Sequence, residues 1–466
     1  MNAPLSAGPQ ATSDVDLAIV GDGAAAALVA LRALQQAAAG TRIALIGPGV
    51  PGVGIAYATD DAGHRLNVPA GKMSALAEQP GDFVDFLRSA GLADDAPGDA
   101  LASRYVPRGG YAAYLAGRLR AAVQSSTAGF EHIARSVIGL DGAQGRRQLQ
   151  LDDGRLVSAR QVVLAVGNAL RPLPLPGAHA VPPACQLAAW EVAALRGIAP
   201  QARVLVVGTG LTMADVVVSL RQRGHQGPIH AVSRHGLLPL PHVACTPWAF
   251  DAQALLAQDL RGRVRALRAE VAAASAAGQP WQAVFEAIRP LGARLWTTLS
   301  AADQARFLRH VVRQWDVHRH RIAPDVDAVL QAALADGQLQ VHAGGATAVQ
   351  VQADGSLQVG RRGAAPLAVD VLVNATGLQV QVERMSSPLL QGLLAAGLAR
   401  PGPHRLGLDV AVDAQGVACL RGADGQVQPD LYLVGSLRMG AEWETIAIPE
   451  LRAQAAATAR AALQGA

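Results

Sequence analysis

Cysteine, lysine and aromatic residues are scarce in this chain of 466 residues. Its three cysteines, Cys185, Cys245 and Cys419, form no C-x-x-C pair, which argues against a disulfide scaffold, a zinc site and a dithiol redox centre. No apolar run reaches the ~18 to 20 residues that a membrane-spanning helix needs. Residues 1–14 lack a basic start followed by an apolar block, so we expect a short mobile leader and a cytoplasmic protein without a membrane partner.

The composition indicates a folded protein with more than one domain. Half of the residues are hydrophobic, and the chain is roughly three times a typical domain length. Forty basic and thirty-six acidic residues give a net charge of +4, and Lys72 is the only lysine. Because the basic residues are scattered and do not form runs, we expect no nucleic-acid partner.

The amino-terminal region has the order strand, glycine turn, helix, strand. The apolar run 15–20 predicts a buried strand, residues 27–39 a helix and residues 42–46 a second strand. The turn between them reads Gly21-x-Gly23-x-x-Ala26. Gly21 permits the sharp turn, Gly23 lets the backbone approach a pyrophosphate, and Ala26 allows close packing of helix on strand. The free N–H groups at the start of the helix would bind phosphates.

The same order recurs about one domain length later. Strand 203–207 is followed by the turn Gly208-Thr-Gly210-Leu-Thr212-Met, by helix 214–223 and by strand 229–233. The last small position of the motif is methionine here, where glycine or alanine is usual. Two such units in one chain predict two dinucleotide-binding domains.

Other segments complete an α/β pattern. Strands are predicted at 162–166, 369–373 and 430–434, each followed by a glycine turn that contains Gly167, Gly377 or Gly435. The proline-rich segment 171–177 predicts a crossing between domains. Residues 249–330 have helical spacing and predict a helical insertion, and Pro449 opens a final helix at 450–463.

Neither unit has an acid at the end of its second strand. An acid there usually bonds the ribose hydroxyls of a dinucleotide. The first unit has Gly47 at this position, so the backbone or water must make the contact. The second unit has Ser233 followed by Arg234, which can neutralise a 2′-phosphate. We therefore predict NADPH rather than NADH, a plain surface arginine being the alternative.

Two histidines raise the question of a metal site. His318 and His320 are two residues apart, and on a helix such a pair points in different directions. The sequence shows no further cysteine or carboxylate partner for them. We predict no metal and expect the two histidines to serve packing and polar networks.

Several motifs together resemble a known family. They are Gly52-Val-Gly-Ile-Ala-Tyr57, Leu66-Asn-Val-Pro69, Lys72-Met-Ser74, Val106-Pro-Arg-Gly-Gly-Tyr111, Gly208-Thr-Gly-Leu-Thr212, Ser233-Arg-His-Gly-Leu-Leu-Pro239, Trp315-Asp-Val-His-Arg-His-Arg321, Asn374-Ala-Thr-Gly377 and Leu433-Val-Gly-Ser-Leu-Arg438. With them the chain resembles the YdhS-like group of two-domain FAD/NAD(P)-binding proteins over nearly its whole length. That group in turn is similar to the class B flavin monooxygenases, including the lysine and ornithine N-hydroxylases.

The resemblance implies an α/β fold with two Rossmann-like domains of the three-layer ββα type. We expect a discontinuous FAD-binding domain at 1–177 and 369–466, with an NAD(P)-binding domain inserted at 178–368. The implied activity is that of an NADPH-using flavin monooxygenase. A C4a-peroxyflavin formed with molecular oxygen would oxidise a small-molecule substrate such as an amine. The alternatives are a flavin reductase or dehydrogenase without oxygen insertion, and a non-catalytic FAD-binding regulatory protein. A homo-oligomer is possible in each case.

The resemblance also assigns roles to individual residues. Asn67 and Lys72 lie in a loop of the kind that borders a flavin ring, and Trp443 lies between the last strand and the last helix. These three are the candidate catalytic residues, although a solvent-facing lysine and a tryptophan that anchors the core are equally open. Ser436 departs from the acid that many flavoproteins carry after the late glycine. The predicted cofactor-binding residues are Gly21, Gly23, Ala26, Asn67, Met73, Ser74, Gly167, Gly208, Gly210, Thr212, Ser233, Arg234, Thr376, Gly377, Gly435 and Ser436.

Overall fold

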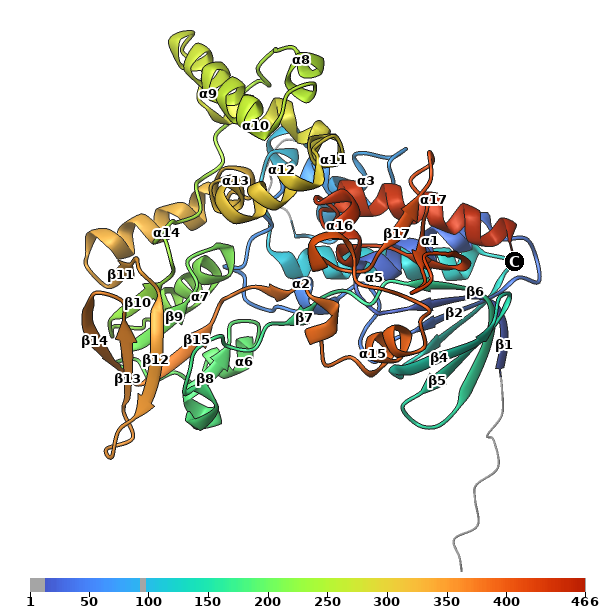
Figure 1. Ribbon diagram of the computed structural model, residues 1–466, viewed down its shortest axis with the longest axis horizontal. Helices are drawn as coiled ribbons and strands as arrows, with labels where there is room; N and C mark the ends of the chain where they lie inside the picture. The colour runs from blue at the N-terminus through green and yellow to red at the C-terminus, as the bar shows by residue number, and fades with distance from the viewer. Residues whose placement is uncertain (1–12, 93–97, 466) are drawn as a thin grey trace, which may run out of the picture.

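The computed structural model describes residues 13–92 and 98–465. Two lobes lie side by side, and a helical segment rises above their junction (Figure 1). The predicted leader falls outside the described residues except for its last two, which begin strand β1 (Ser13–Val20). Among the described residues, no helix combines the length and apolar character that crossing a membrane requires.

The first lobe is built on a nine-stranded sheet whose central path runs β17-β18-β19-β6-β1-β2-β3. Its parallel centre pairs β1 with both β2 and β6, and β6 with β19. The hairpin β4–β5 joins through β5 to β6. The strands are β2 (Arg42–Ile46), β3 (Gly129–Ile133), β4 (Val137–Ala143), β5 (Arg146–Leu151), β6 (Leu156–Leu164), β17 (Val410–Val412), β18 (Ala418–Arg421) and β19 (Val427–Leu433).

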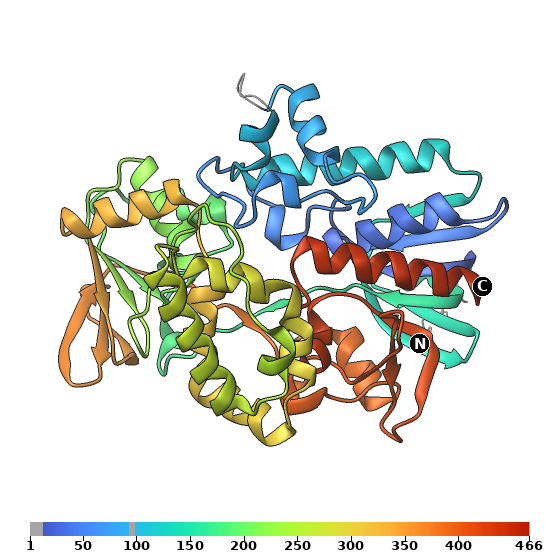
Figure 2. The same cartoon turned by 90° about the horizontal axis from the view of Figure 1, so that it is seen from above.

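Alternate residues of these strands feed two cores on opposite faces of the sheet. Leu17 and Ile19 pack with helices on one face, and Ala18 and Val20 pack with the β4–β5 hairpin and helix α15 on the other. Seen from above, α1, α5 and α17 lie across the first face (Figure 2). The helices are α1 (Ala24–Gln36), α3 (Asp82–Ser89), α5 (Arg108–Ser125), α15 (Pro388–Ala395) and α17 (Ile448–Gln464). This gives three layers, as predicted.

The second lobe contains a parallel five-stranded sheet in the order β11-β10-β9-β15-β8. Helices α7 and α14 pack together against it. A three-stranded antiparallel sheet, β12-β13-β14, covers the other face. The elements are β8 (Gln186–Ala188), β9 (Val204–Val207), α7 (Leu211–Gln222), β10 (Ile229–Val232), α14 (Pro324–Ala335), β11 (Leu339–His342), β12 (Ala346–Val351), β13 (Leu357–Arg361), β14 (Ala364–Val369) and β15 (Val371–Asn374). The two parallel sheets confirm the predicted α/β class with two Rossmann-like units.

The helical segment lies between β10 and β11 in the chain. Its members are α8 (Ala252–Leu256), α9 (Leu260–Ala276), α10 (Gln282–Ile288), α11 (Gly292–Thr297), α12 (Ala301–Arg306) and α13 (Val312–Arg319). Side chains of Asp251, Asp259 and Ser300 cap three of these helices. The sequence placed the end of this insertion at about residue 330, but α14 already packs on α7 as part of the second lobe.

Two short antiparallel strands mark the crossing between the lobes. Strand β7 (Ala169–Leu170) leaves the first lobe and pairs with β16 (Leu378–Gln379), which returns to it. Because β15 pairs with β8 and β9, the strand predicted at 369–373 belongs to the second sheet. The predicted return to the first domain at residue 369 therefore places this strand in the wrong sheet. Adjacency along the chain could not reveal its pairing.

Candidate functional site

The first glycine turn is shaped by a close backbone contact. Gly21 has a φ of +131°, and a Cβ there would lie 2.3 Å from the carbonyl oxygen of Ala165, just after β6. Gly23 caps α1 with extended backbone, and no side-chain cap is present at that end of the helix among the described residues. Ala26 is fully buried where α1 packs on the sheet. The three residues therefore form the turn, the open helix end and the close packing that the motif predicts.

The late glycine turn of the first lobe lies beside this helix end. Gly435 has a φ of +97°, and a Cβ there would lie 3.6 Å from the side chain of Ala25 in the first turn of α1. The next residue, Ser436, is buried, and its hydroxyl has no hydrogen-bond partner among the described residues. Gly167 follows β6 with a φ of +70° and open space around it. Buried polar groups are normally bonded, so the Ser436 hydroxyl indicates a missing ligand.

The loop that carries Asn67 and Lys72 contacts the helical insertion. Lys72 is half exposed, and its Nζ lies 3.2 Å from Oε2 of Glu286 in α10. The backbone oxygen of Asn67 lies 3.0 Å from Nε2 of His242, which comes from the second lobe. Met73 and Ser74 are buried, and the Ser74 hydroxyl bonds to backbone groups of its own loop. Ser74 therefore shapes the loop with its side chain.

Trp443 packs against the helical insertion. Its ring stacks on Trp296 of α11 at 5.1 Å between centroids and meets Phe307 edge-on at 5.3 Å. The backbone of Trp443 has a φ of +63°, a left-handed conformation that costs energy for a bulky residue. The neighbouring Glu444 pairs with Arg319 at 2.5 Å. Of the two readings open from the sequence, these contacts favour an anchor between domain and insertion.

The second glycine turn repeats the geometry of the first. Gly208 has a φ of +116°, and a Cβ there would lie 2.2 Å from the carbonyl oxygen of Ala375, just after β15. Gly210 caps α7 with nothing near its missing Cβ, and Thr212 lies in the first turn of that helix. The contact with Ala375 places Thr376 and Gly377 beside this turn. The sequence had placed these two residues in the first domain.

Beyond β10, Ser233 and Arg234 border the second turn. The Ser233 hydroxyl accepts hydrogen bonds from Thr209 at 2.9 Å and from the Gly236 backbone at 3.0 Å, so it holds the loop together. Arg234 is exposed. Its charge acts on Arg171 of the crossing segment, together with those of Arg313 and Arg384. Desolvation and then these three like charges lower the pKa of Arg171.

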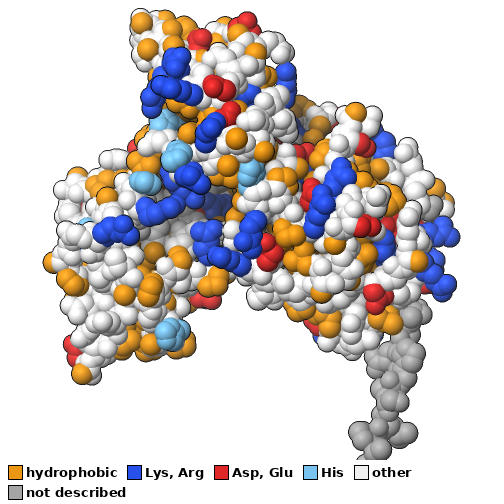
Figure 3. All heavy atoms as spheres, in the orientation of Figure 1, with side chains coloured by type: hydrophobic (Ala, Val, Ile, Leu, Met, Phe, Trp, Pro, Cys, Tyr) orange, Lys and Arg blue, Asp and Glu red, His pale blue; other side chains and the backbone are white. Residues whose placement is uncertain are grey.

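These arginines define what we call the arginine cleft: Arg171, Arg234, Arg313 and Arg384. Only Arg313 has a carboxylate partner among the described residues, Asp316 of its own helix. The backbone oxygen of Arg171 accepts a hydrogen bond from Asn374, which precedes the Ala375 contact. Basic side chains gather in the recess between the lobes, below the helical insertion (Figure 3). The sequence signalled only Arg234 of this set.

On the other side of the junction, charges are paired. Arg108 of α5 binds Asp215 of α7 at 2.7 and 3.2 Å, and both side chains are largely buried. Close by, the Ser219 hydroxyl donates to Asp61 at 2.7 Å and lies 2.8 Å from His64 Nε2. All three groups of this second cluster are buried. We call this the paired interface, which no motif in the sequence predicts.

Comparison with known families fits this geometry. Residues 18–169, which contain the first glycine turn and the Asn67–Lys72 loop, match the family model described as FAD-NAD(P)-binding. The match covers about a third of the chain and is confined to its amino-terminal region. No curated protein matches the sequence. The narrower resemblance to the YdhS-like group stays a prediction.

Solved structures share the fold of this chain over nearly its whole length. L-lysine 6-monooxygenase from Pseudomonas syringae is 18% identical with a TM-score of 0.62, over 97% of this chain and 99% of that chain. Ornithine hydroxylase from Pseudomonas aeruginosa is 15% identical with a TM-score of 0.63, over the same shares. Thioredoxin reductase from Lactococcus lactis is 12% identical with a TM-score of 0.52, over 97% and 98%. At these identities the likeness establishes the fold.

The residues of the first lobe fit the cofactor that the matching family model names. The open amino terminus of α1 offers N–H groups to a pyrophosphate, and Gly23 at that end adds no side chain, its missing Cβ lying 3.9 Å from the Cα of Gly54. The buried Ser436 hydroxyl beside it is a free partner for a polar group of the flavin chain. The second turn offers the same features, with Gly210 in place of Gly23. Each lobe therefore has one cradle for a dinucleotide.

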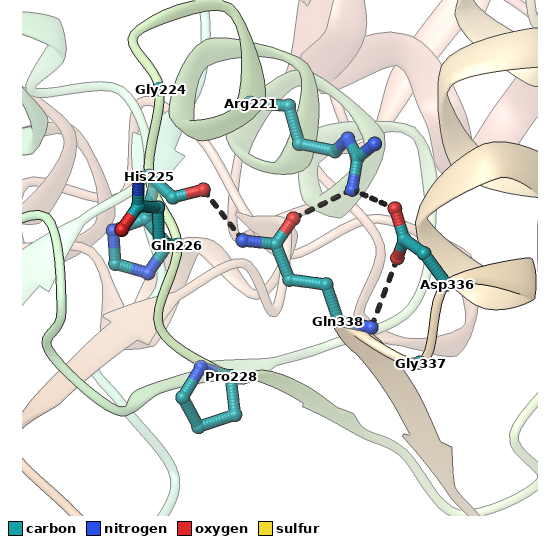
Figure 4. Close-up of a pocket in the computed structure, with 8 residues that line it drawn as sticks. All are labelled: Arg221, Gly224, His225, Gln226, Pro228, Asp336, Gly337 and Gln338. Atoms are coloured by element: carbon teal, nitrogen blue, oxygen red, sulfur yellow. Dashed lines mark hydrogen bonds and ion pairs between the residues drawn. The ribbon is translucent and has the colours of Figure 1, made fainter.

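A further depression on the second lobe lies away from these cradles. It is lined by Arg221, Gly224, His225, Gln226, Pro228, Asp336, Gly337 and Gln338, where the strands β10 and β11 begin (Figure 4). Dinucleotides bind at the opposite, carboxyl ends of such strands. Arg221 bonds to Asp336 at 2.7 Å and to Gln338 at 2.6 Å, so these three side chains satisfy one another, while the two ring nitrogens of His225 have no partner among the described residues. We assign this depression a structural role.

The two histidines considered as metal ligands are engaged in packing. His318 stacks on Phe285 at 5.4 Å and meets Trp281 edge-on at 4.9 Å. Burial lowers the pKa of His320 to about 4. Within residues 13–92 and 98–465, no group of three or more potential metal ligands occurs.

Proposed function

We propose that this protein is an FAD-dependent monooxygenase that uses NADPH and oxidises a small molecule, such as an amine, on a nucleophilic nitrogen. The observation that carries the proposal is the pair of glycine cradles, one in each lobe, with the arginine cleft beside the second of them. The shared fold with lysine and ornithine hydroxylases over 97% of the chain supports it. We propose that residues 1–177, with those after the second crossing strand, form the FAD-binding domain.

The arginine cleft supports NADPH as the reductant. Arg234 follows β10, where an arginine can bind a 2′-phosphate with two parallel hydrogen bonds. Arg171 and Arg384 add positive charge without a carboxylate partner among the described residues. An acid at the end of β10 would repel a 2′-phosphate. The cleft therefore favours the more negatively charged of the two nicotinamide dinucleotides.

The bound flavin would supply the chemistry of hydride acceptance and oxygen activation. The overall reaction would consume one NADPH, one proton and one O₂ per amine and yield NADP⁺, water and the hydroxylamine. The chain itself would orient the two dinucleotides and keep water from the reacting groups. We propose that Lys72 and Asn67 position flavin or substrate beneath the helical insertion, since Lys72 already pairs with Glu286 there.

The fold is also shared with a thioredoxin reductase, which makes reduction without oxygen insertion the second candidate. The three cysteines argue against a dithiol mechanism, because all are free and none lies in a C-x-x-C pair. The experiment below distinguishes the monooxygenase from a flavin reductase that passes electrons to another acceptor.

The test has two steps. First, purified protein is reconstituted with FAD; a protein that stays colourless at saturating FAD leaves only a role without flavin chemistry. Second, the flavoprotein is given NADPH, ¹⁸O₂ and a panel of small amines, and products are analysed by mass spectrometry. A monooxygenase places one ¹⁸O atom in the product. NADPH oxidation that yields only hydrogen peroxide with every amine supports the reductase instead.

A further inference from the structure

The end of β2 has no room for the acid that usually binds the ribose. A Cβ at Gly47 would lie 2.8 Å from the Cβ of Asp22 and 2.8 Å from the backbone carbon of Gly21. Contacts under about 3 Å between such atoms force the structure to shift. The glycine at position 47 is therefore required by the shape of the turn, and a side chain from another position must supply any carboxylate here.

Asp22 supplies one. It is the residue between Gly21 and Gly23, and its Oδ2 accepts a hydrogen bond from the Gly49 backbone at 2.7 Å. A Cβ at Gly49 would lie 2.6 Å from the same oxygen, so Asp22 occupies the space beside the segment Gly47–Gly49. The carboxylate thus stands against the end of β2, where an acid at position 47 would stand.

The surroundings leave this carboxylate available. Asp22 is half-buried, and no lysine or arginine pairs with it among the described residues. The bond from Gly49 uses Oδ2 and fixes the orientation of the side chain, while Oδ1 has no protein donor in the same part of the chain. A carboxylate accepts hydrogen bonds from two hydroxyls of one sugar ring, and such charge-assisted bonds are stronger than neutral ones.

We propose that the Asp22 carboxylate binds the hydroxyl groups of the adenosine ribose of FAD, in place of the missing acid at the end of β2. The proposal rests on the proposed function, since it takes FAD as the occupant of the first cradle. It assigns a ribose-binding role to the variable position inside the glycine motif. The competing role for Asp22 is only to hold the Gly47–Gly49 segment in place through the hydrogen bond from the Gly49 backbone.

Asp16 provides a matched control for a carboxylate that only holds a neighbouring backbone segment in place. It lies near the opposite end of β1, and its Oδ2 accepts a hydrogen bond from the Arg42 backbone at 2.8 Å, the same kind of contact. Replacing Asp16 removes a carboxylate that holds the start of β2, far from the glycine turn. A variant of Asp22 that acts only through loop stability should behave like the Asp16 variant.

The experiment measures binding of two ligands to apoprotein by quenching of flavin fluorescence. The ligands are FAD and its analogue with a 2′,3′-dideoxyadenosine, and the proteins are wild type, D22A, D22N and D16A. We expect wild type to bind FAD about 10- to 100-fold more tightly than the analogue, because hydrogen bonds to a charged group are lost. In D22A this ratio should fall to near one, and D22N, which keeps the shape and a Gly49 contact, should be intermediate. D16A should keep the wild-type ratio.

Each outcome bears on one proposal. If wild type binds neither ligand, the proposed function fails. If D22A keeps the wild-type ratio of the affinity for FAD to the affinity for the analogue, the ribose role of Asp22 is wrong, even if D22A binds both ligands more weakly than wild type. Unfolding curves of D22A and D16A show whether weaker binding follows from lost stability, and the ratio of the two ligands is independent of the folded fraction.

Discussion

The two sides of the junction between the lobes use arginine in opposite ways. In the paired interface, Arg108 forms an ion pair with Asp215. Asp61 accepts a hydrogen bond from Ser219 and forms an ion pair with Arg223. In the arginine cleft, Arg171, Arg234 and Arg384 have no carboxylate partner among the described residues. Arg171 is partly buried, whereas Arg234 and Arg384 are exposed, so water solvates these two and a ligand can reach them. The ion pairs of the paired interface hold the lobes together, and we infer that the arginine cleft binds an anion.

The largest change in stability between the two sides should appear when a buried ion pair of the paired interface is broken. Arg108→Ala leaves Asp215 without its cation, and both side chains are only 15% and 12% exposed. We expect a loss of about 3 kcal/mol in the free energy of unfolding, measured in urea. Arg196→Ala is the control, because its pair with Asp60 is exposed and solvent-screened, so its loss should change stability far less. Similar losses for both variants would remove the distinction between the buried and exposed pairs.

Acid should weaken the same junction through His242, whose Nε2 lies 3.0 Å from the Asn67 backbone oxygen. Burial, and then the Arg321 charge, lowers the pKa of His242 to about 4 from the ordinary 6.5. The unfolded chain therefore binds the proton first as the pH falls, and stability is lost between about pH 6.5 and 4. From pH 7 to 5 we expect this group to cost about 2 kcal/mol.

His242→Gln, which keeps a hydrogen-bond donor, isolates this contribution. Urea unfolding of wild type and H242Q is compared at pH 7 and pH 5. The variant should lose about 2 kcal/mol less than wild type over this interval. Parallel pH profiles would show that His242 does not titrate in this window.

On the unpaired side, substitution should change binding and leave folding alone. Arg234→Ala should raise the KM for NADPH about tenfold or more, because a charge-assisted bond to the 2′-phosphate is lost, and leave the KM for NADH nearly unchanged. Its unfolding free energy should stay within about 0.5 kcal/mol of wild type. Equal effects on both dinucleotides would overturn the assignment of NADPH.

The smallest effect concerns Arg171. Desolvation and three like charges disfavour its charged form, so Arg171→Gln should raise the unfolding free energy slightly, by up to about 0.5 kcal/mol. The gain should shrink at high salt, where the like charges are screened. Urea unfolding of wild type and R171Q at about 20 mM and about 1 M NaCl measures this gain in stability under weak and strong screening. A clear loss of stability at low salt would mean that Arg171 has a partner.

The parts of the structure set by local sequence could be predicted. Strand 42–46 is found unchanged, and both glycine turns have the positive φ that their sequence requires. Helix α1 begins at Ala24, three residues before the prediction, because Gly23 itself caps it. Helix α7 likewise begins at Leu211.

The parts set by distant contacts could not be predicted. Arg108 and Asp215 are 107 residues apart, and nothing in either neighbourhood marks the pairing. Strand β15 has the composition of any buried strand, so its sheet follows only from its partners. The Ser74 hydroxyl is bound within its own loop, a detail that a motif cannot specify. The roles of Lys72, Asn67 and Trp443 remain predictions.

The crossing ribbon has a consequence for communication between the lobes. The carbonyl of Ala165 lies where a side chain of residue 21 would be, and β7 begins four residues later. The carbonyl of Ala375 lies where a side chain of residue 208 would be, and β16 begins three residues later. Since β7 and β16 are hydrogen-bonded to each other, one short two-stranded ribbon connects the segments that contact both glycine turns. Any swing of one lobe against the other would pull on both turns at once. Occupation of one cradle would then be felt in the other through fewer than a dozen residues of backbone on each side.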